Sequence, residues 1–433
     1  MIRQMTVGLY TLGCKVSQYE TEAIAEAFEA RGVRVLPFTE ACDFYVINTC
    51  TVTAESDRKS RQIIRRAKKR NPEARVLVCG CYSQRSPDEV AAIPDVDAIV
   101  GTDNKLSLVD IALSLKAGER VISVTDISDA PFERMSITKA PRTRAYVKIE
   151  DGCESKCTYC AIPSARGPVR SKPREDVIDE VRGLCMGGTL EVVLTGIETG
   201  SYGVDFDEKY RLVDLLRELD MLGFARRIRL GSLAPELCGE EFAEGISRLR
   251  SMTPHFHISM QSGSDKILRL MKRRYTRERA ITNINRLRSL LPNAKFTTDL
   301  MVGFPGEDED DFLDTVSFVK EAGIFDAHVF QYSRRHSTPA SCFDGQVSED
   351  IKASRSERLI EVVRCEKLSQ LQGVINEGRV LEVIFESRKG GVCIGHSAEF
   401  IEVECACQRD IRGKMIKCRP VSINGERLAV EIL

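Results

Sequence analysis

The sequence predicts an α/β protein with two helix-covered parallel parts followed by a small barrel of short strands. Three observations predict this fold class. Short apolar runs alternate with helical patterns over residues 1–127, six more strand candidates recur between helices over residues 145–368, and short alternating strands fill most of residues 369–433. Strands that alternate with helices imply parallel sheets, because each crossover helix packs back on the sheet.

The first part, residues 1–127, is expected to be an open parallel sheet with helices on both faces. Its strand candidates are VGLYTLGC, DFYVINTC and RVLVCGC, with a helix over about 17–31 and a basic helix that stops at Asn71-Pro72. The three runs end in Cys14, Cys50 and Cys81. Because ligand sites in such sheets lie at the carboxyl ends of the strands, we expect these thiols to converge at one edge.

Residues 128–144 contain two prolines and no periodicity, so they are expected to be a linker. The following part is expected to be an open, incomplete (β/α)6 barrel with active residues on the loops at the strand C-termini. Its strands are AYVKIE, LEVVLTG, RRIRLGS, HFHISMQ, AKFTTDLMVGF and DAHVFQYS. Its helices are expected at about 173–186, 212–222, 235–250, 276–291 and 309–322.

A helical stretch over about 349–374 gives way to short strands from GRVLEVIFE to RLAVEIL. These strands are expected to form a small antiparallel barrel of the oligonucleotide-binding kind. Cys405 and Cys407 fall on the same face of one strand, which favours packing inside the barrel over metal binding.

Composition limits the class of protein. The chain has 433 residues, enough for two or three cores, and a net charge of -1, so a nucleic-acid partner must be attracted by a local patch. Sixteen cysteines suggest disulfides only in a small secreted chain, whereas this chain is large and shows no cleavage motif near its start. We therefore expect reduced thiols in the cytoplasm. No apolar run approaches the roughly 20 residues that a membrane-spanning helix needs.

The run DGCESKCTYC places Cys153, Cys157 and Cys160 as C-x3-C-x2-C. Three thiolates on one loop can bind three irons of a 4Fe-4S cluster and leave the fourth iron without a protein ligand. Clusters that only carry electrons usually have four cysteines, and zinc sites usually add a second Cys or His pair, so neither pattern fits. Three buried thiols or a fortuitous zinc loop are the alternatives.

This motif resembles the radical S-adenosylmethionine superfamily. The resemblance implies that the open iron binds the methionine part of S-adenosylmethionine, whose reductive cleavage gives a 5'-deoxyadenosyl radical. It also implies cofactor contacts for Tyr159, Thr195, Gly196, Gly303 and Gly306, although glycines after strands are also ordinary turns. Three further residues, which end their strands at the same mouth, can bind ribose or substrate or merely cap the strands: Ser232, Gln261 and Asp299.

The other cysteine trio narrows the resemblance. TLGCKVSQYETE, INTCTVT and CGCYSQ are similar to the three cysteine motifs of the methylthiotransferase N-terminal domain. The resemblance implies that Cys14, Cys50 and Cys81 hold an auxiliary 4Fe-4S cluster, whose open iron carries the sulfur to be inserted. Ser17 departs from the asparagine expected there. The alternative is that the three cysteines are small core residues, as Cys42 and Cys79 are expected to be.

The helix between Cys50 and Cys81 bears a one-signed arc of charge, with Ile63, Ile64 and Ala67 opposite. The arc consists of Arg58, Lys59, Arg61, Arg65, Arg66, Lys68, Lys69 and Arg70. Because soluble surface helices usually mix signs, the arc predicts an RNA-binding face, and a merely solvated face is the alternative. Further positive charge is expected near the barrel mouth from Lys272, Arg273, Arg274, Arg277, Arg334, Arg335 and His336.

The C-terminal part resembles a TRAM domain, an RNA-binding barrel found on RNA-modifying enzymes, so the resemblance covers almost the whole chain. LGCKVSQYETE and HVFQYSRRHSTPA are closest to the methylthiotransferase branch that acts on N6-threonylcarbamoyladenosine (t6A) in tRNA, although His336-Ser337 replaces the usual pair. Other branches act on isopentenyladenosine in tRNA or on a ribosomal-protein aspartate. A non-catalytic RNA-binding iron-sulfur sensor is the remaining alternative.

The resemblance implies conversion of t6A to ms2t6A next to the anticodon, with S-adenosylmethionine as methyl donor and radical source. Adenine C2 has no acidic proton at neutral pH, so radical chemistry with exclusion of water suits it. The target base must also leave the anticodon-loop stack. The expected partners are the tRNA anticodon stem-loop, an electron donor such as flavodoxin or ferredoxin, and a sulfur source.

Overall fold

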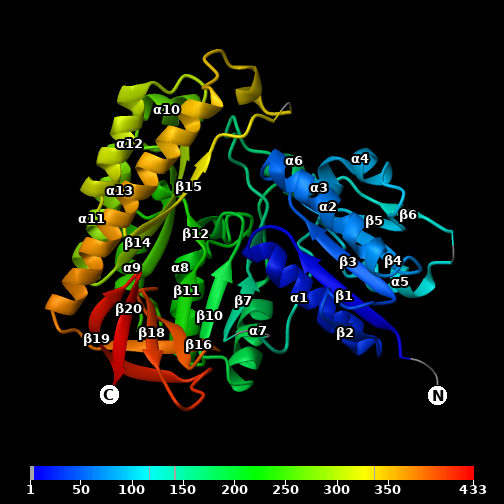
Figure 1. Ribbon diagram of the computed structural model, residues 1–433, viewed down its shortest axis with the longest axis horizontal. Helices are drawn as coiled ribbons and strands as arrows, with labels where there is room; N and C mark the ends of the chain where they lie inside the picture. Colours follow the sequence, from blue (N-terminus) through cyan, green and yellow to red (C-terminus); the bar gives the residue numbers. More distant parts are fainter. Residues whose placement is uncertain (1–3, 117, 141–142, 336) are drawn as a thin grey trace.

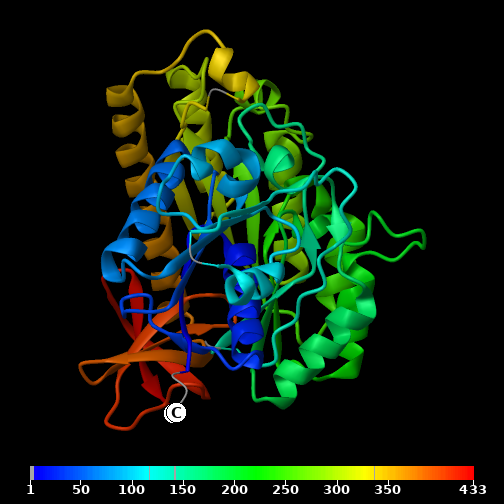
Figure 2. The same cartoon turned by 90° about the vertical axis from the view of Figure 1, so that its right-hand side faces the viewer.

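The computed structural model describes residues 4–116, 118–140, 143–335 and 337–433. It contains a parallel N-terminal sheet, a central partial barrel and a closed C-terminal barrel, which confirms the predicted fold class. The N-terminal sheet stands beside the partial barrel, and the closed barrel lies against one end of that barrel (Figures 1 and 2). In the described part of the chain, no helix has the length and apolar character needed to cross a membrane.

The N-terminal strands pair in parallel in the order β2-β1-β3-β4-β5-β6. They are β1 (Thr6–Thr11), β2 (Arg34–Leu36), β3 (Phe44–Thr49), β4 (Arg75–Gly80), β5 (Ala98–Val100) and β6 (Val121–Ser123). Helices α1 (Lys15–Ala30) and α5 (Ser107–Ser114) cover one face. The other face is covered by α2 (Ala54–Arg70), α3 (Cys81–Arg85) and α4 (Pro87–Ala91). Both faces are buried, which explains the nearly continuous apolar strands.

The partial barrel is built from two parallel sheets, ordered β11-β10-β7 and β12-β13-β14-β15. Their strands are β7 (Arg144–Lys148), β10 (Glu191–Thr195), β11 (Arg227–Leu230), β12 (Ser232–Leu233), β13 (His255–Gln261), β14 (Lys295–Val302) and β15 (Asp326–Gln331). The outer helices are α7 (Arg174–Met186), α8 (Leu212–Leu222), α9 (Glu240–Ser247), α11 (Arg277–Leu290) and α12 (Glu309–Glu321). Shorter elements are β8 (Glu150–Asp151), β9 (Arg170–Ser171), α6 (Ile162–Arg166), α10 (Asp265–Leu270), η1 (Thr199–Ser201), η2 (Pro235–Leu237) and η3 (Pro339–Cys342).

Two details of the barrel differ from expectation. The third predicted strand is split at Gly231, whose N–H donates to the Leu194 carbonyl (2.8 Å). A Cβ at Gly231 would lie 2.7 Å from Thr199 Oγ1, so a larger residue would displace the Thr199 side chain. The helix predicted over 235–250 is also shorter, because η2 and Gly239 precede α9.

The C-terminal barrel closes in the order β16-β17-β18-β20-β19. Its strands are β16 (Leu381–Lys389), β17 (Val392–Ser397), β18 (Glu402–Ala406), β19 (Met415–Asn424) and β20 (Arg427–Ile432). One neighbouring pair, β18 with β20, is parallel and the others are antiparallel. The small antiparallel barrel predicted above is confirmed, with one parallel pair, because a closed ring with an odd number of strands cannot alternate direction throughout. The arrangement agrees with the Greek-key barrel of oligonucleotide-binding proteins.

Helix α13 (Glu349–Asn376) joins the partial barrel to the closed barrel. Leu359 and Val363 pack in the core of the partial barrel, whereas Leu371 and Val374 pack in the core of the closed barrel. The boundary expected between residues 368 and 369 therefore falls inside one continuous helix.

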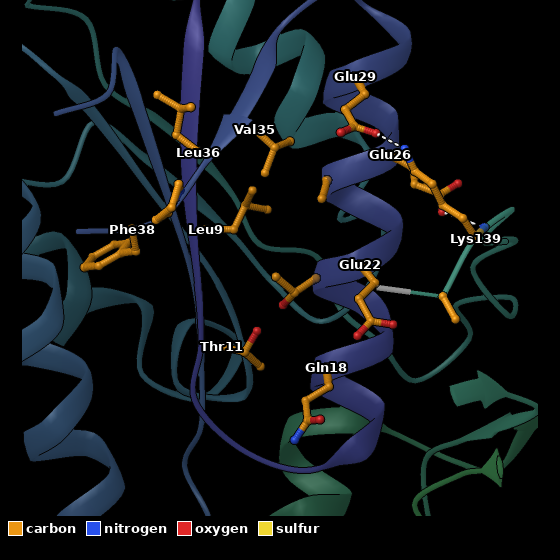
Figure 3. A pocket seen from close by; sticks show the side chains of 14 residues that line it. Leu9, Thr11, Gln18, Glu22, Glu26, Glu29, Val35, Leu36, Phe38 and Lys139 are labelled. Carbon is orange, nitrogen blue, oxygen red and sulfur yellow. Dashed lines mark hydrogen bonds and ion pairs between the residues drawn. The ribbon is translucent and has the colours of Figure 1, made fainter. Parts of the chain in front are cut away.

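Part of the expected linker is tightly packed. Met135 and Ile137 are buried in the core of the partial barrel, and the Ile137 N–H donates to Glu180 Oε1 (2.7 Å). Beside it lies a cavity of about 410 Å³ between α1, β1 and β2 (Figure 3). There Lys139 pairs with Glu29 (2.7 Å), and the Thr138 N–H donates to Glu26 (2.9 Å). Acidic residues of α1 therefore hold this segment in place.

Candidate iron-sulfur centres and substrate chamber

The structure brings Cys14, Cys50 and Cys81 to one edge of the N-terminal sheet. Cys14 caps α1 after β1, Cys50 follows β3, and Cys81 begins α3 directly after β4. These three strands are neighbours in the sheet. A Cβ on Gly13 would lie 3.3 Å from Cys50 Cβ, which shows how closely the Cys14 and Cys50 loops approach. Cys14 is exposed, whereas Cys50 and Cys81 are buried.

The other trio lies on the loop after β7 and β8. Cys153, Cys157 and Cys160 all line one cavity of about 130 Å³. The Ser155 N–H donates to Cys153 Sγ and the Ile162 N–H donates to Cys160 Sγ, both at 3.4 Å. Hydrogen bonds to sulfur favour the thiolate, which is the form that binds iron.

Positive charge also reaches this cavity. Arg273 Nη1 donates to Cys157 Sγ at 3.2 Å. Burial raises the pKa of the Cys160 thiol to about 12, so a free thiolate would be costly there. Metal coordination removes that cost, because it deprotonates a thiol outright.

The donors present suit iron-sulfur clusters, which are held by cysteine thiolates. All sixteen cysteines lie in the described part of the chain and have free thiols. In the same part, no group of three Cys, His, Asp or Glu side chains is arranged to hold a single metal ion. A cubane binds each thiolate through a different iron, so its ligands stand further apart than those of one ion.

Arg166, at the end of α6, connects the two trios. This fully buried guanidinium donates from Nε to Cys81 Sγ (3.2 Å) and from Nη1 to Asp151 (3.0 Å). Asp151 in turn accepts the N–H of Gly152, next to Cys153. Ser17, where asparagine was expected, lies 3.4 Å from Arg166 Nη2 and 3.8 Å from Cys14 Sγ. Helices α3 and α6 lie side by side at this junction (Figure 1).

Glu20 completes the buried network. Arg166 Nη1, Lys105 Nζ and Lys148 Nζ lie 2.8, 3.0 and 3.0 Å from its Oε1 atom. Burial alone would raise the pKa of Glu20, but Arg166, Lys105 and Lys148 hold it well below its ordinary value. Since Glu20 belongs to α1 and Lys148 to β7, the network fixes the N-terminal sheet on the partial barrel.

Among the residues expected to contact the cofactor, Tyr159 and Gln261 line the thiol cavity. Tyr159 packs edge-on against Phe304, with ring centroids 6.4 Å apart. The residues that line this cavity in the described structure do not include Thr195, Gly196, Ser232, Asp299, Gly303 or Gly306.

Three of these outlying residues have partners elsewhere. Asp299 Oδ2 lies 3.2 Å from His257 Nε2 inside the barrel. A Cβ on Gly196 would clash with the Glu150 carboxylate, and one on Gly303 would clash with Lys352. These close contacts give Gly196 and Gly303 a role within the protein, and their contacts with the cofactor stay predictions.

Sequence reasoning missed two acidic residues of the thiol cavity, Glu198 and Glu236. Glu198 follows β10 in the run TGIE, and Glu236 lies in η2. Burial raises the pKa of Glu198 to about 7. A carboxylate beside the thiols suits an ammonium group, and its place after a barrel strand was the signal that could have identified it. Lys272, Arg273 and Arg274 also line the cavity, so their charge lies at the expected mouth.

On helix α2, the side chains of Arg65, Arg66 and Lys69 are exposed, and in the described structure they form no hydrogen bond or ion pair. Arg58, in contrast, pairs with Glu55 (2.6 Å), and Lys68 lies 3.4 Å from Asp97. Helix α2 therefore offers only part of its charge to a partner.

The loop after β15 needs a correction. Arg335, expected on the RNA-binding surface, is buried, pairs with Asp57 (2.7 Å) and donates to the Thr51 carbonyl. It therefore holds the Cys50 loop and is not available to RNA. Arg334 is exposed and donates to the Ser341 carbonyl (2.9 Å). His336 lies outside the described residues.

Comparisons with known proteins agree with this geometry. The Radical SAM superfamily matches residues 147–319, and the Uncharacterized protein family UPF0004 matches residues 6–101. Threonylcarbamoyladenosine tRNA methylthiotransferase MtaB of Bacillus subtilis is 40% identical, over 96% of this chain and 93% of that protein. The protein of the same name from Thermotoga maritima is 36% identical, over 97% and 96%.

A solved structure shows the same fold. It is the radical S-adenosylmethionine methyltransferase TsrM from Kitasatospora setae with cobalamin and a [4Fe-4S] cluster bound. The TM-score is 0.57 at 16% identity, over 78% of this chain and 77% of that chain.

Proposed function

Because the chain belongs to the radical S-adenosylmethionine methylthiotransferase family, we infer that it adds a methylthio group to N6-threonylcarbamoyladenosine in tRNA. The product is ms2t6A next to the anticodon, with the new group on adenine C2. The observation that carries this proposal is the pair of three-thiol sites joined by Arg166. One such site suits radical generation, and the second suits sulfur insertion.

The cofactors are two 4Fe-4S clusters and S-adenosylmethionine. When bound, they would supply the radical and the methyl group and would carry the sulfur that is inserted. Cys153, Cys157 and Cys160 would hold the cluster that meets S-adenosylmethionine, and Cys14, Cys50 and Cys81 the auxiliary one. Glu198 and Glu236 would attract the ammonium group of the methionine part. Tyr159 and Gln261 line the space for the rest of the cofactor. Arg273 neutralises thiolate charge at Cys157.

The anticodon stem-loop is the macromolecular partner that we propose. Arg65, Arg66 and Lys69 of α2 would bind phosphates, with Arg334 and the TRAM-like barrel adding contacts. We divide the chain into the auxiliary-cluster domain (1–127), a linker (128–144), the radical core (145–368) and the TRAM-like domain (369–433). A flavodoxin or ferredoxin would donate electrons, and a separate donor would supply sulfur. A tRNA substrate and thiols that must stay reduced favour a cytoplasmic location.

Mass spectrometry of tRNA nucleosides tests the function. Cells that lack the protein should accumulate t6A in place of ms2t6A, and the wild-type gene should restore ms2t6A. Loss of the methylthio group from isopentenyladenosine, or from a ribosomal-protein aspartate, would assign the enzyme to another branch. If reconstituted protein with reductant and S-adenosylmethionine formed no 5'-deoxyadenosine, it would be a sensor and not an enzyme.

A further inference from the structure

The interior of the partial barrel is unusually polar. Ala145, Val147, Val192 and Leu194 pack outward against the helices, so their alternate neighbours on β7 and β10 point inward. By the same alternation, Arg229 on β11 and His255 on β13 face the interior. Parallel barrels usually fill this space with branched apolar side chains. Charged groups here therefore need either internal partners or a ligand.

The internal partners are incomplete. Glu191 pairs closely with Arg229 (2.8 Å) but lies 3.9 Å from Arg144, which also pairs with Glu386 (3.1 Å). Arg229 Nη1 and His255 Nδ1 are buried and have no hydrogen-bond partner within the described structure. Both atoms belong to side chains that are at least nine-tenths buried. Buried polar groups ordinarily have hydrogen-bond partners, so these two atoms can bind a polar ligand.

Lys15 brings a further cation from the neighbouring sheet. It is the first residue of α1, directly after Cys14, and is half-buried. Arg229, Arg144 and Asp299 are the charged side chains that act on its ammonium. In the described structure its ammonium has no hydrogen bond or ion pair within reach. The carboxylate of Asp299 already pairs with His257 (3.2 Å) and His328 (3.6 Å).

An aromatic side chain covers one end of this polar interior. Phe400, from the loop between β17 and β18, packs against Arg229 (4.7 Å), Arg144 (4.9 Å) and His255 (4.8 Å between ring centroids). Cavities of about 760 and 460 Å³ open beside it, the first lined by Arg144 and the second by Phe400. At the other end of β13, Ser259 and Gln261 line the thiol cavity. Strand β13 thus runs from the end covered by Phe400 to the thiol cavity.

We propose that Lys15, Arg229 and Arg144 form the subsite for a carboxylate carried on the N6 substituent of the substrate adenosine. This inference rests on the proposed function. In t6A a short carbamoyl link joins the carboxylate to the ring that receives sulfur. The group that binds it must therefore lie close to the sulfur-inserting site, and Lys15 is adjacent to Cys14. The buried donor of Arg229 offers the charge-assisted hydrogen bond that a carboxylate accepts.

A matched pair of RNAs tests the subsite directly. Anticodon stem-loops carrying t6A or its methyl ester have the same backbone phosphates and differ only in the carboxylate charge. Wild-type protein with S-adenosylhomocysteine should bind the acid about 10- to 100-fold more tightly than the ester. Lys15→Gln should lose most of that preference, Lys15→Arg should keep it, and Lys139→Gln, which removes a cation paired with Glu29, should leave it unchanged.

Iron content and 5'-deoxyadenosine formation without RNA are measured on Lys15→Gln in parallel, which separates substrate binding from cluster damage. If that variant loses iron, the acid-ester comparison on wild-type protein decides. Equal binding of the acid and the ester RNA by wild-type protein overturns the subsite. Equal weakening of both RNAs by Lys15→Gln also overturns it, because Lys15 would then bind a phosphate. If t6A RNA is bound selectively but never methylthiolated, the proposed function fails and the subsite stands.

Discussion

Replacement of Arg166 by glutamine should destabilise the protein strongly. The change leaves Glu20 and Asp151 without the guanidinium that lies 2.8 and 3.0 Å away, in a site closed to water. Breaking a buried ion pair by removing one partner costs about 3–5 kcal/mol, because the other charge stays buried. Lys105 and Lys148 remain beside Glu20, so we expect the lower end, about 3 kcal/mol.

Urea denaturation followed by circular dichroism measures this loss of unfolding free energy. Each transition is analysed separately, because a chain with several cores need not unfold in one step. Arg166→Lys should fall between wild type and glutamine, since lysine keeps the charge but cannot reach Cys81, Glu20 and Asp151 together. Arg182→Gln is the matched control, because its pair with Asp179 is exposed and is worth no more than about 1 kcal/mol. An Arg166→Gln protein within about 1 kcal/mol of wild type would refute the network as the clamp between the two cysteine sites.

Three further predictions concern the auxiliary cysteines, the basic helix and acid stability. Cys50→Ala should still form 5'-deoxyadenosine but lose methylthiolation in a nucleoside assay, and product formation at the wild-type rate would remove the auxiliary site from the reaction. Charge reversal of Arg65 and Lys69 should weaken tRNA binding. It should also reduce the slope of log K against log salt by about one unit per lost phosphate contact. Arg58→Glu should have a smaller effect, because Arg58 already pairs with Glu55. Burial would raise the pKa values of Glu20 and Asp151, but neighbouring cations lower them in the folded state. The two carboxylates therefore stabilise the fold above their ordinary pKa values of 4.5 and 3.8. This stabilisation is lost as the pH falls through the folded-state pKa values. Urea titrations from pH 6 to pH 3 should show this loss, and Glu20→Gln should show less of it.

Periodicity predicted most of the fold, because strands and helices are local patterns. The convergence of Cys14, Cys50 and Cys81 at one edge also followed from the sequence, since each ends a strand or begins the turn after it. The parallel pair β18 and β20 did not, because strand order is set by packing between distant segments.

The contacts that join the two cysteine sites could not be predicted. Arg166 lies 85 positions from Cys81, and nothing around it in the sequence marks it as their link. Arg335 was misassigned for the same reason, because its partner Asp57 is 278 positions away. A charge pattern shows which residues are cationic but not which of them pair with carboxylates inside the folded protein.

The position of Phe400 changes how the tail of the chain should be regarded. This residue of the small C-terminal barrel packs on Arg144, Arg229 and His255 inside the partial barrel. Shortening the protein after α13 would therefore do more than remove the proposed RNA contacts, since it would expose these three side chains to solvent and oxygen. The C-terminal barrel is thus part of the wall of the central domain as well as a proposed RNA-binding module.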